Sequence, residues 1–381
     1  MLLSAAIIVR DEAEFLDACL ASLHGLVDEI VVVDTGSIDG SVDVARRHGA
    51  VIGHEPWQSD FATPRNRSLD LASGEWILYI DADERVRPGD HEAVREQLAA
   101  ASDYVSFRVR FVPRVNWTPY REFRLWRHRP DIRFVGAMHE TMLPAIERVA
   151  GNEDMLIADL DLVVPDGLTI EHFGYEGDQS HKHARNEPML RASLEASPDR
   201  PFLYDHLARI YEDLGDDERA RATWRAGIEV ARARATEHPD DKLLWVDLLV
   251  HAVARDDPDG DVAGVIGEAQ DKFPDNPVVE FAVATHEFTT GDPATAARRL
   301  DRLVALDLEA IVATGSAYDQ RIFGEWAWNA LGLCRFALGE YTGAAEAFGL
   351  AEGANPDNLA YRARRQLAQA RAALGSAGRA R

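Results

Sequence analysis

The chain has 381 residues, of which 46% are hydrophobic and 28% charged, a composition typical of a folded protein with two or three domains. Acidic residues outnumber Lys and Arg by 65 to 41, and the net charge of −24 argues against a nucleic acid or an anionic membrane as the main partner. Two distant cysteines exclude a disulfide framework and a cysteine-based zinc site, and the sequence has no signal peptide or membrane span, so we expect a cytoplasmic protein.

The first half of the chain alternates apolar strand patterns with helical ones. Asp11, with Glu14 three residues later, has the pattern of a helix N-cap and capping box. In chain order, the patterns predict a strand at 2–9, a helix to about 23, a strand at 29–34, a helix ending near 49, a short strand at 50–54, a helix at about 63–72 and a strand at 75–80. This alternation indicates a mostly parallel sheet covered on both faces.

Polar residues follow three of the predicted strands. Arg10 and Asp11 follow the first strand, Asp34 ends the second, and Asp81-Ala82-Asp83 follows the fourth. Open α/β sheets bind ligands at the carboxyl ends of their strands, so these residues lie where a site is expected. The chain has no G-x-G-x-x-G after its first strand, no Walker A loop and no G-x-S-x-G elbow, which weakens the dehydrogenase, NTPase and α/β-hydrolase interpretations.

The second half, from about residue 181, has helical patterns and a repeat. The 34-residue window 325–358 has the residues of a tetratricopeptide repeat, including Trp328, Leu331, Gly332, Tyr341 and Phe348. Weaker copies span about 201–234 and 277–310, and 240–274 predicts another helix pair. Because one such repeat cannot bury its own apolar face, three or more must stack.

Asp81 and Asp83 are the first candidates for chemistry. Side chains two apart at a strand end point to the same side, and together they can hold a hard divalent cation. The tripeptide alone leaves open a simpler interpretation, in which the acids only cap the strand terminus.

A second charged feature is a window with eight arginines and only two acids, between Arg108 and Arg133. Arg108 and Arg110 alternate with apolar residues and are expected on one strand face. The arginines could bind phosphate or carboxylate groups, with the nearby aromatic residues stacking on a sugar, or they could form salt bridges to the acidic surface.

Several ordered motifs closely resemble those of the family 2 glycosyltransferases, which have the GT-A fold. They are 7–12 (Ile-Ile-Val-Arg-Asp-Glu), 32–41 (Val-Val-Asp-Thr-Gly-Ser-Ile-Asp-Gly-Ser), Arg65-Asn66, Asp81-Ala82-Asp83, 121–124, 136–140 and 172–175. Members of this family with tetratricopeptide tails, among them the bacteriocin-type peptide S-glycosyltransferases, share the series. The resemblance covers about residues 4–176. We therefore expect an α/β GT-A domain with a Rossmann-like mixed sheet over 1–180 and an all-α tetratricopeptide-like domain over 181–381.

The resemblance also implies residue roles. Glu140 would be the general base of an inverting transfer, and His139 would orient the sugar or the acceptor. The metal, Mg²⁺ or Mn²⁺, would be held by Asp83, His172 and Asp81. The resemblance assigns the nucleotide sugar to Val9, Arg10, Glu12, Asp34, Arg65, Asp81, Ala82 and Arg124.

These features predict a metal-dependent glycosyltransferase that uses a nucleotide sugar, with a UDP-sugar as the expected donor. The acceptor stays open between a peptide Cys, Ser or Thr side chain and a glycan or natural product. The tail is expected to bind the acceptor, a partner or a second copy of the chain as a homodimer. Two alternatives are a non-catalytic scaffold with a relic GT-A domain and a nucleotidyltransferase; the latter would want a Gly-rich basic loop, which the segment Val9 to Ala13 does not provide.

Overall fold

A computed structural model of the chain describes residues 1–174, 180–234, 242–255, 262–312 and 315–379. Contacts divide it into two compact units: Met1–Arg185 with Val312–Ala317, called here the sheet unit, and Asn186–Ile311 with Tyr318–Arg381, called the helical unit. Over the described ranges, no helix has both the length and the apolar character that crossing a membrane requires.

The sheet unit alternates strands and helices along the chain. Its elements are β1 (Leu3–Val9), α1 (Ala13–Ser22), β2 (Glu29–Asp34), α2 (Ser41–Arg47), β3 (Val51–His54), α3 (Ala62–Leu71), β4 (Trp76–Tyr79), β5 (Glu84–Val86), α4 (His91–Ala100), β6 (Tyr104–Val112), β7 (Tyr120–Arg127), α5 (Leu143–Glu153), β8 (Leu156–Asp159), α6 (Leu160–Val163) and β9 (Thr169–His172). The first four strands and the three helices between them confirm the pattern that the sequence predicts.

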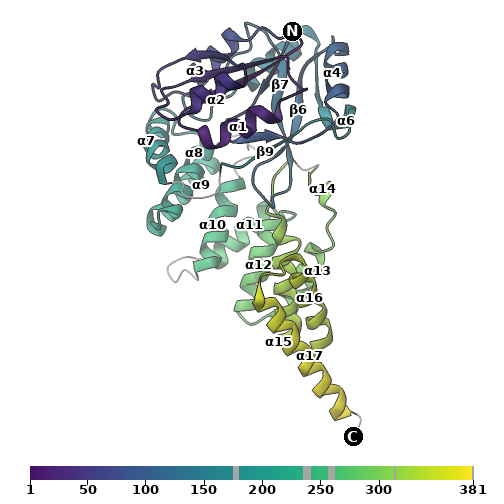
Figure 1. Cartoon of the computed structure of the whole chain (residues 1–381). Coiled ribbons are helices and arrows are strands. Elements are labelled where there is room, and N and C mark those ends of the chain that lie inside the picture. Colours follow the sequence, from purple (N-terminus) through teal and green to yellow (C-terminus); the bar gives the residue numbers. More distant parts are fainter. Residues whose placement is uncertain (175–179, 235–241, 256–261, 313–314, 380–381) are drawn as a thin grey trace. The chain divides into compact units, whose positions relative to one another are not determined.

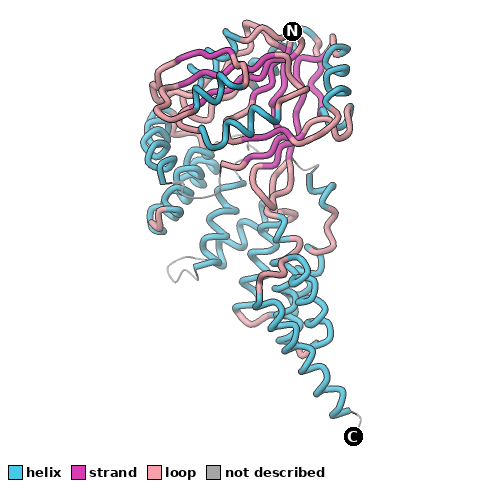
Figure 2. The backbone as a smooth tube through the Cα atoms, in the orientation of Figure 1, coloured by secondary structure: helices cyan, strands magenta, loops and turns pink. Residues whose placement is uncertain are grey.

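The strands form one mixed sheet in the order β3-β2-β1-β4-β7-β6-β9-β5, with β8 paired to β6. Figure 2 shows the strands of this sheet in magenta. The first four strands of this order are parallel, with Val9 opposite Asp34. β7 runs antiparallel to both β4 and β6, and β5 runs antiparallel to β9. The parallel half is the part that the repeated strand–helix pattern predicts. The other half is mixed, because β6 pairs antiparallel with β7 but parallel with β8 and β9, and its β4–β7, β6–β9 and β5–β9 pairs join segments distant in sequence.

Each face of the sheet has its own core. Alternate residues such as Leu3, Ala5 and Ile7 pack with α1, α2, α4 and α6, whereas Ala6 and its neighbours on adjacent strands pack with α3 and α5. In Figure 1, α1 and α2 lie on the side of the sheet that faces the viewer. The two-residue side-chain period of a strand explains how a near-continuous apolar run supplies both cores.

The start of α1 differs from the predicted capping box. The N-cap is Glu12, and no side chain caps the helix there. Asp11 instead has a φ of +54°, and its carboxylate accepts a hydrogen bond of 2.7 Å from the backbone N–H of Ile38. The carboxylate thus ties the loop after β1 to the loop after β2, a long-range contact that competes with the local cap.

The helical unit consists of paired helices. It begins within α7 (Ser180–Ala196) and continues with α8 (Pro201–Asp213), α9 (Asp217–Ala233), α10 (Lys242–Arg255), α11 (Val262–Lys272), α12 (Pro277–Thr289), α13 (Pro293–Leu303), α14 (Leu308–Val312), a short 3₁₀ turn at Gln320–Ile322, α15 (Glu325–Ala337), α16 (Tyr341–Ala354) and α17 (Leu359–Arg379). The predicted pairs are present as α8–α9, α10–α11, α12–α13 and α15–α16 (Figure 1).

Close packing between α15 and α16 explains the repeat residues. A Cβ added at Gly332 would lie 2.6 Å from the Phe348 ring, so only glycine lets the aromatic ring pack there. Leu331 and Phe348 are fully buried, and Trp328 is partly buried against the cluster that contains Leu331. The fold class that the sequence predicts, an α/β domain followed by a tetratricopeptide-like helical domain, is therefore confirmed.

Each unit contains one of the two cysteines, Cys19 in the sheet unit and Cys334 in the helical unit. Both thiols are free and buried. The Cys19 thiol lies 3.4 Å from the carbonyl oxygen of Asp81. Both residues thus belong to the cores.

Candidate active site

A pocket of about 180 Å³ lies at the carboxyl ends of β1, β2 and β4. Eight of the predicted site residues line it: Val9, Arg10, Glu12, Arg65, Asp81, Ala82, Asp83 and His172. The other lining residues are Ile8, Thr35, Trp57, Phe61, Lys182 and Arg185. Residues from six separate stretches of sequence thus converge at the edge of the sheet where an α/β fold binds ligands.

The Asp81-Ala82-Asp83 segment is a tight turn between β4 and β5. The backbone N–H of Glu84 donates to the carbonyl of Asp81 over 3.0 Å, and the N–H of Asp81 donates to the Glu84 carboxylate over 2.8 Å. Arg124 donates two hydrogen bonds, of 2.9 and 3.2 Å, to the Glu84 carboxylate. Glu84 is buried, and burial is the main reason that its pKa rises to about 7. Glu84 and Arg124 therefore fix the turn.

Asp83 and His172 meet because β5 pairs with β9. Glu84 lies opposite His172 in the register, and the N–H of Phe173 donates to the carbonyl of Asp83 over 2.9 Å. Nε2 of His172 lies 3.3 Å from Oδ2 of Asp83. Burial opposes ionisation, but hydrogen bonding to His172 and the positive charges nearby outweigh it and lower the pKa of Asp83 to about 2. Asp83 is therefore a carboxylate at neutral pH.

The donor set beside Asp83 fits a divalent cation. Nδ1 of His172 lies 3.2 Å from the carbonyl oxygen of Pro113 and donates to it, and Nε2 faces the Asp83 carboxylate. Burial lowers the pKa of His172, but the hydrogen bond to Asp83 outweighs burial and raises it, so a cation bound here would take the place of the Nε2 proton. Within the described ranges no three His, Cys, Asp or Glu side chains form a ready-made metal cluster. Mg²⁺ and Mn²⁺ commonly take only one or two protein ligands and complete their shell with phosphate oxygens and water, which matches an oxygen–nitrogen pair.

Arg65 joins two other predicted residues, Asp81 and Glu140. Its Nη1 lies 2.9 Å from Oδ1 of Asp81, and its Nε forms an ion pair with Glu140. The guanidinium also lies 4.3 Å from the ring centroid of Tyr79, whose hydroxyl donates to Asp81 over 3.2 Å. Burial alone would raise the pKa of Asp81, but Arg65 and then Arg124 outweigh it, and the pKa is lowered. The buried arginine therefore keeps the Asp81 carboxylate ionised.

Glu140 lies at the end of a backbone loop that two hydrogen bonds close. Val135 and Thr141 exchange N–H to carbonyl bonds of 3.0 Å, and Gly136 and His139 within the loop have φ values of +104° and +53°. The amide of Asn66, next to Arg65 on α3, donates to and accepts from the backbone of Phe134 over 2.9 Å. The Arg65-Asn66 pair therefore anchors this loop to α3 twice. His139 and Glu140 are not among the residues that line the pocket.

Asp34 and Arg124 also lie next to the pocket but outside its lining. Asp34 is 6% exposed, and its carboxylate accepts from the N–H groups of Gly36 and Ser37 over 3.3 and 3.0 Å. Arg124 is 5% exposed and pairs with Glu84 and Glu122. Both side chains are thus held by protein groups at the base of the site.

Six lining residues are absent from the predicted set, and four of them carry an aromatic ring or a positive charge. Trp57 and Phe61 form an edge-to-face pair 4.7 Å apart, and the Arg185 guanidinium lies 5.3 Å from the Phe61 ring. Nζ of Lys182 lies 3.3 Å from Oδ2 of Asp83. Lys182 is one of only three lysines in the chain, and this rarity is a signal in the sequence that could have drawn attention to it.

The arginines between Arg108 and Arg133 are largely neutralised by acids. Arg108 pairs with Asp159, Arg121 with Asp161, and Arg129 with both Asp131 and Glu153. Arg108 and Arg110 share one strand face, because they alternate with buried residues of β6 as expected. Of the two interpretations of this window, the salt-bridge network accounts for these arginines.

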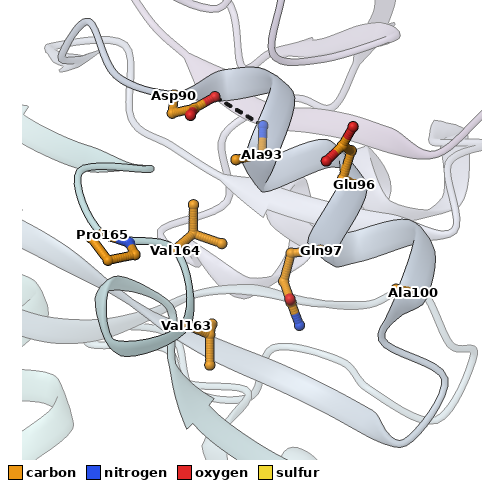
Figure 3. A pocket seen from close by; sticks show the side chains of 8 residues that line it. All are labelled: Asp90, Ala93, Glu96, Gln97, Ala100, Val163, Val164 and Pro165. Atoms are coloured by element: carbon orange, nitrogen blue, oxygen red, sulfur yellow. Dashed lines mark hydrogen bonds between the residues drawn. The ribbon is translucent and has the colours of Figure 1, made fainter.

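A second hollow, of about 420 Å³, lies between α4 and the segment 163–165 (Figure 3). Asp90 at its rim caps α4, since its carboxylate accepts from the N–H of Ala93 over 3.0 Å. None of the predicted site residues lines this hollow. The chemistry-bearing residues therefore gather at the carboxyl edge of the sheet.

The mixed sheet with an Asp-x-Asp turn after its fourth strand defines the sheet unit as a GT-A domain. Residues 4–150 match the model of the family "Glycosyl transferase family 2". Over these residues the chain is therefore similar to the family 2 glycosyl transferases.

Several curated proteins are similar to longer stretches of the chain. A TPR repeat-containing protein of Synechococcus elongatus is 32% identical over 272 residues, which are 70% of this chain and 64% of that protein. The SPbeta prophage-derived glycosyltransferase SunS of Bacillus subtilis is 25% identical over 57% of this chain and 51% of its own length. The lipopolysaccharide core biosynthesis glycosyltransferase LpsC of Rhizobium meliloti is 38% identical over 28% of this chain and 41% of its own. The chain thus spans one half to two thirds of the first two relatives.

Solved structures that each cover about half of the chain match it at low similarity. Glucosyl-3-phosphoglycerate synthase from Mycobacterium tuberculosis, solved with Mn²⁺ and UDP, covers 51% of this chain and 79% of its own, with 15% identity and a TM-score of 0.36. The TPR protein TTC0263 from Thermus thermophilus covers 50% of this chain and 91% of its own, with 17% identity and a TM-score of 0.34. Scores this low carry no conclusion.

Proposed function

We propose that the protein is a metal-dependent, inverting glycosyltransferase that takes a sugar from a nucleotide diphosphate sugar, with UDP-sugar as the donor. The observation that carries the proposal is the pairing of Asp83 with His172, 3.3 Å apart, at the carboxyl edge of a domain similar to the family 2 glycosyl transferases. Arg65, which holds both Asp81 and Glu140, connects this pair to a candidate base.

In this proposal Asp83 and His172 would hold Mg²⁺ or Mn²⁺, and Asp81 would contact both the cation and the ribose. The bound cation compensates the charge that develops on the diphosphate as the glycosidic bond breaks. Val9, Arg10, Glu12, Ala82 and Asp34 surround the nucleoside. The pKa of Glu12 rises to about 7, chiefly through burial and then through the Asp83 carboxylate.

Glu140 accepts the proton of the acceptor hydroxyl or thiol, and His139 orients the sugar or acceptor beside it. The acceptor oxygen or sulfur forms a bond to the anomeric carbon from the face opposite the diphosphate. The bond from that carbon to the β-phosphate oxygen breaks, and its electron pair leaves with the diphosphate. General-base help of this kind contributes roughly 10²–10⁴-fold to a rate.

The acceptor in this proposal is a peptide Cys, Ser or Thr side chain, and the helical unit presents it or pairs two copies of the chain. The second candidate is a glycan acceptor, favoured by the similarity to a lipopolysaccharide core glycosyltransferase over 112 residues. A panel of purified nucleotide sugars, offered with a thiol peptide, a hydroxyl peptide or an oligosaccharide, distinguishes the two by mass spectrometry. Absence of transfer and of donor hydrolysis with every sugar would favour a scaffold.

The proposal is tested by calorimetry with UDP. We expect UDP to bind at least ~10-fold more tightly with Mg²⁺ or Mn²⁺ than with a chelator, because the diphosphate otherwise faces the uncompensated carboxylates of Asp81 and Asp83. Asp83→Ala should remove most of this difference. The matched control is Asp43→Ala, since Asp43 is 72% exposed on α2 and should leave it unchanged. Equal UDP affinity with chelator and with metal would exclude the metal assignment.

A further inference from the structure

Lys182 lies in the first turns of α7, in the part of that helix that belongs to the sheet unit. Its Nζ is 2.9 Å from the carbonyl oxygen of Gly174 and 3.3 Å from Oδ2 of Asp83. The side chain is 22% exposed and lines the pocket. A lysine is therefore held against the same carboxylate oxygen that faces Nε2 of His172.

Two arginines of the site, Arg65 and Arg124, are more fully engaged than Lys182. Arg65 uses Nε and Nη1 for Glu140 and Asp81, and Arg124 is bound by Glu84 and Glu122. Lys182 has three N–H donors. Among the described residues, its hydrogen-bond acceptors are the carbonyl oxygen of Gly174, at 2.9 Å, and the carboxylate of Asp83, at the longer distance of 3.3 Å. An ammonium on a flexible four-carbon stem can exchange such partners at low cost, and it binds phosphate as a compact point charge.

We propose that Lys182 binds the diphosphate of the donor and that it changes partner when the metal arrives. Without metal the ammonium neutralises Asp83. If a divalent cation were bound by Asp83, Nζ of Lys182 would lose this carboxylate as a partner and would be free to turn to the phosphate oxygens of the donor. This inference rests on the proposed function, because it requires a diphosphate and a divalent cation in the pocket.

The exchange predicts two effects of opposite sign for Lys182→Met. Mn²⁺ alone should bind about 2- to 5-fold more tightly, because the variant lacks the ammonium that competes with Mn²⁺ for Asp83. This range corresponds to the free energy of a partly exposed ion pair. UDP in the presence of saturating Mn²⁺ should bind roughly 10- to 100-fold more weakly, the usual worth of a charge-assisted hydrogen bond. A residue with only a structural role would weaken both. Lys272→Met, in the helical unit, is the matched control and should change neither affinity.

A second measurement needs no variant, because the chain has only three lysines, Lys182, Lys242 and Lys272. Reductive methylation of the parental protein, followed by peptide mass spectrometry, reports the accessibility of each amine. UDP with Mn²⁺ should protect Lys182 at least several-fold and leave the other two unaffected. Equal methylation of Lys182 with and without UDP and Mn²⁺ would overturn the inference.

The calorimetric outcomes separate the two proposals. Parental protein that binds no UDP with Mn²⁺ overturns the proposed function, and the inference with it. Parental protein that binds UDP, together with a Lys182→Met variant of unchanged UDP affinity, overturns the inference alone. A variant that binds both Mn²⁺ and UDP more weakly also overturns it, because Lys182 would then only support the fold. Lys182→Gln repeats the test with a polar side chain.

Discussion

At the scale of single residues, Glu140 is held before any substrate arrives, because the Arg65 guanidinium already pairs with its carboxylate. Glu140→Gln keeps the shape and removes the base. We expect near-normal UDP affinity and transfer to a hydroxyl acceptor slowed by roughly 10²–10⁴-fold. With a thiol acceptor the substitution should slow transfer less. A thiol with a pKa of about 8.5 is partly ionised at neutral pH, and this thiolate needs no general base.

The measurement pairs calorimetry of UDP with transfer rates by mass spectrometry on one preparation. Glu147→Gln on the exposed face of α5 is the control and should transfer at the parental rate. If Glu140→Gln also transfers at the parental rate to a hydroxyl, Glu140 is not the base.

Gly174 gives a prediction that depends on packing alone. A Cβ at this position would lie 1.7 Å from Oδ2 of Asp83 and 3.0 Å from Nζ of Lys182. Gly174→Ala must therefore displace the Asp83 carboxylate from its position beside His172. We expect the metal-dependent gain in UDP affinity to fall at least ~10-fold, as for loss of a charged hydrogen-bonding partner.

The control for this substitution is Gly151→Ala on α5, where an added Cβ meets nothing within 4 Å. Alanine there should be neutral or slightly stabilising, because it favours a helix over glycine. Calorimetry with UDP and Mn²⁺ checks both variants. Unchanged affinity in Gly174→Ala would mean that Asp83 does not need its present position.

At the scale of elements, the sequence predicts the parallel half of the sheet more fully than the rest of the site. Apolar runs bounded by glycine and polar residues locate β1 to β4 because each run carries its own signal. The β5–β9 pairing, which brings His172 to Asp83, joins segments almost ninety residues apart and has no local signal. The position of Lys182 on α7 depends on the same long-range packing. A tertiary contact likewise determines the role of Asp11, because its carboxylate accepts a hydrogen bond from the Ile38 N–H instead of capping α1.

Contacts between α8, α9 and α10 make the helical unit sensitive to pH. Asp205 on α8 is fully buried, accepts a 3.0 Å hydrogen bond from the Trp224 indole and lies 3.0 Å from Arg209. Burial, followed by the neighbouring Asp247 carboxylate, raises the pKa of Asp205 from 3.8 to about 7. The folded unit therefore binds this proton more tightly than the unfolded chain does. Its stabilising contribution is complete below pH 3.8 and is lost as the pH rises through 7.

Asp205→Asn tests this assignment, since the amide oxygen keeps the Trp224 bond and the side chain does not titrate. Between pH 5 and pH 8 the melting temperature of the parental helical unit should fall by roughly 5 °C more than that of the variant. Calorimetric scans at the two pH values give the comparison. Parallel melting profiles for the two proteins would contradict the raised pKa.

At the scale of the whole molecule, the two compact units have separate cores and are expected to melt separately. Phe348→Ala should destabilise the helical unit by about 3–5 kcal/mol, the usual range for truncating a buried phenylalanine. UDP affinity should be unchanged, because every residue that lines the pocket belongs to the sheet unit. Leu350→Ala, at a half-exposed position of the same helix, should cost less than ~1 kcal/mol.

Scanning calorimetry and UDP titration on the same three proteins check this prediction. An unchanged melting profile for Phe348→Ala would mean that the tetratricopeptide packing of α15 on α16 is not what stabilises this unit. A loss of UDP affinity would mean that the two units do not behave independently.

The two buried thiols have a consequence for measuring such independence. Burial is the main reason that the pKa of Cys19 rises well above its ordinary value and that of Cys334 rises to about 11. Because the thiolate is the reactive form, an alkylating reagent reaches each sulfur only after the surrounding core has opened. Each unit thus carries one natural reporter of its own opening. A pulse of iodoacetamide, read by peptide mass spectrometry, gives the lifetimes of both closed cores from a single unlabelled sample.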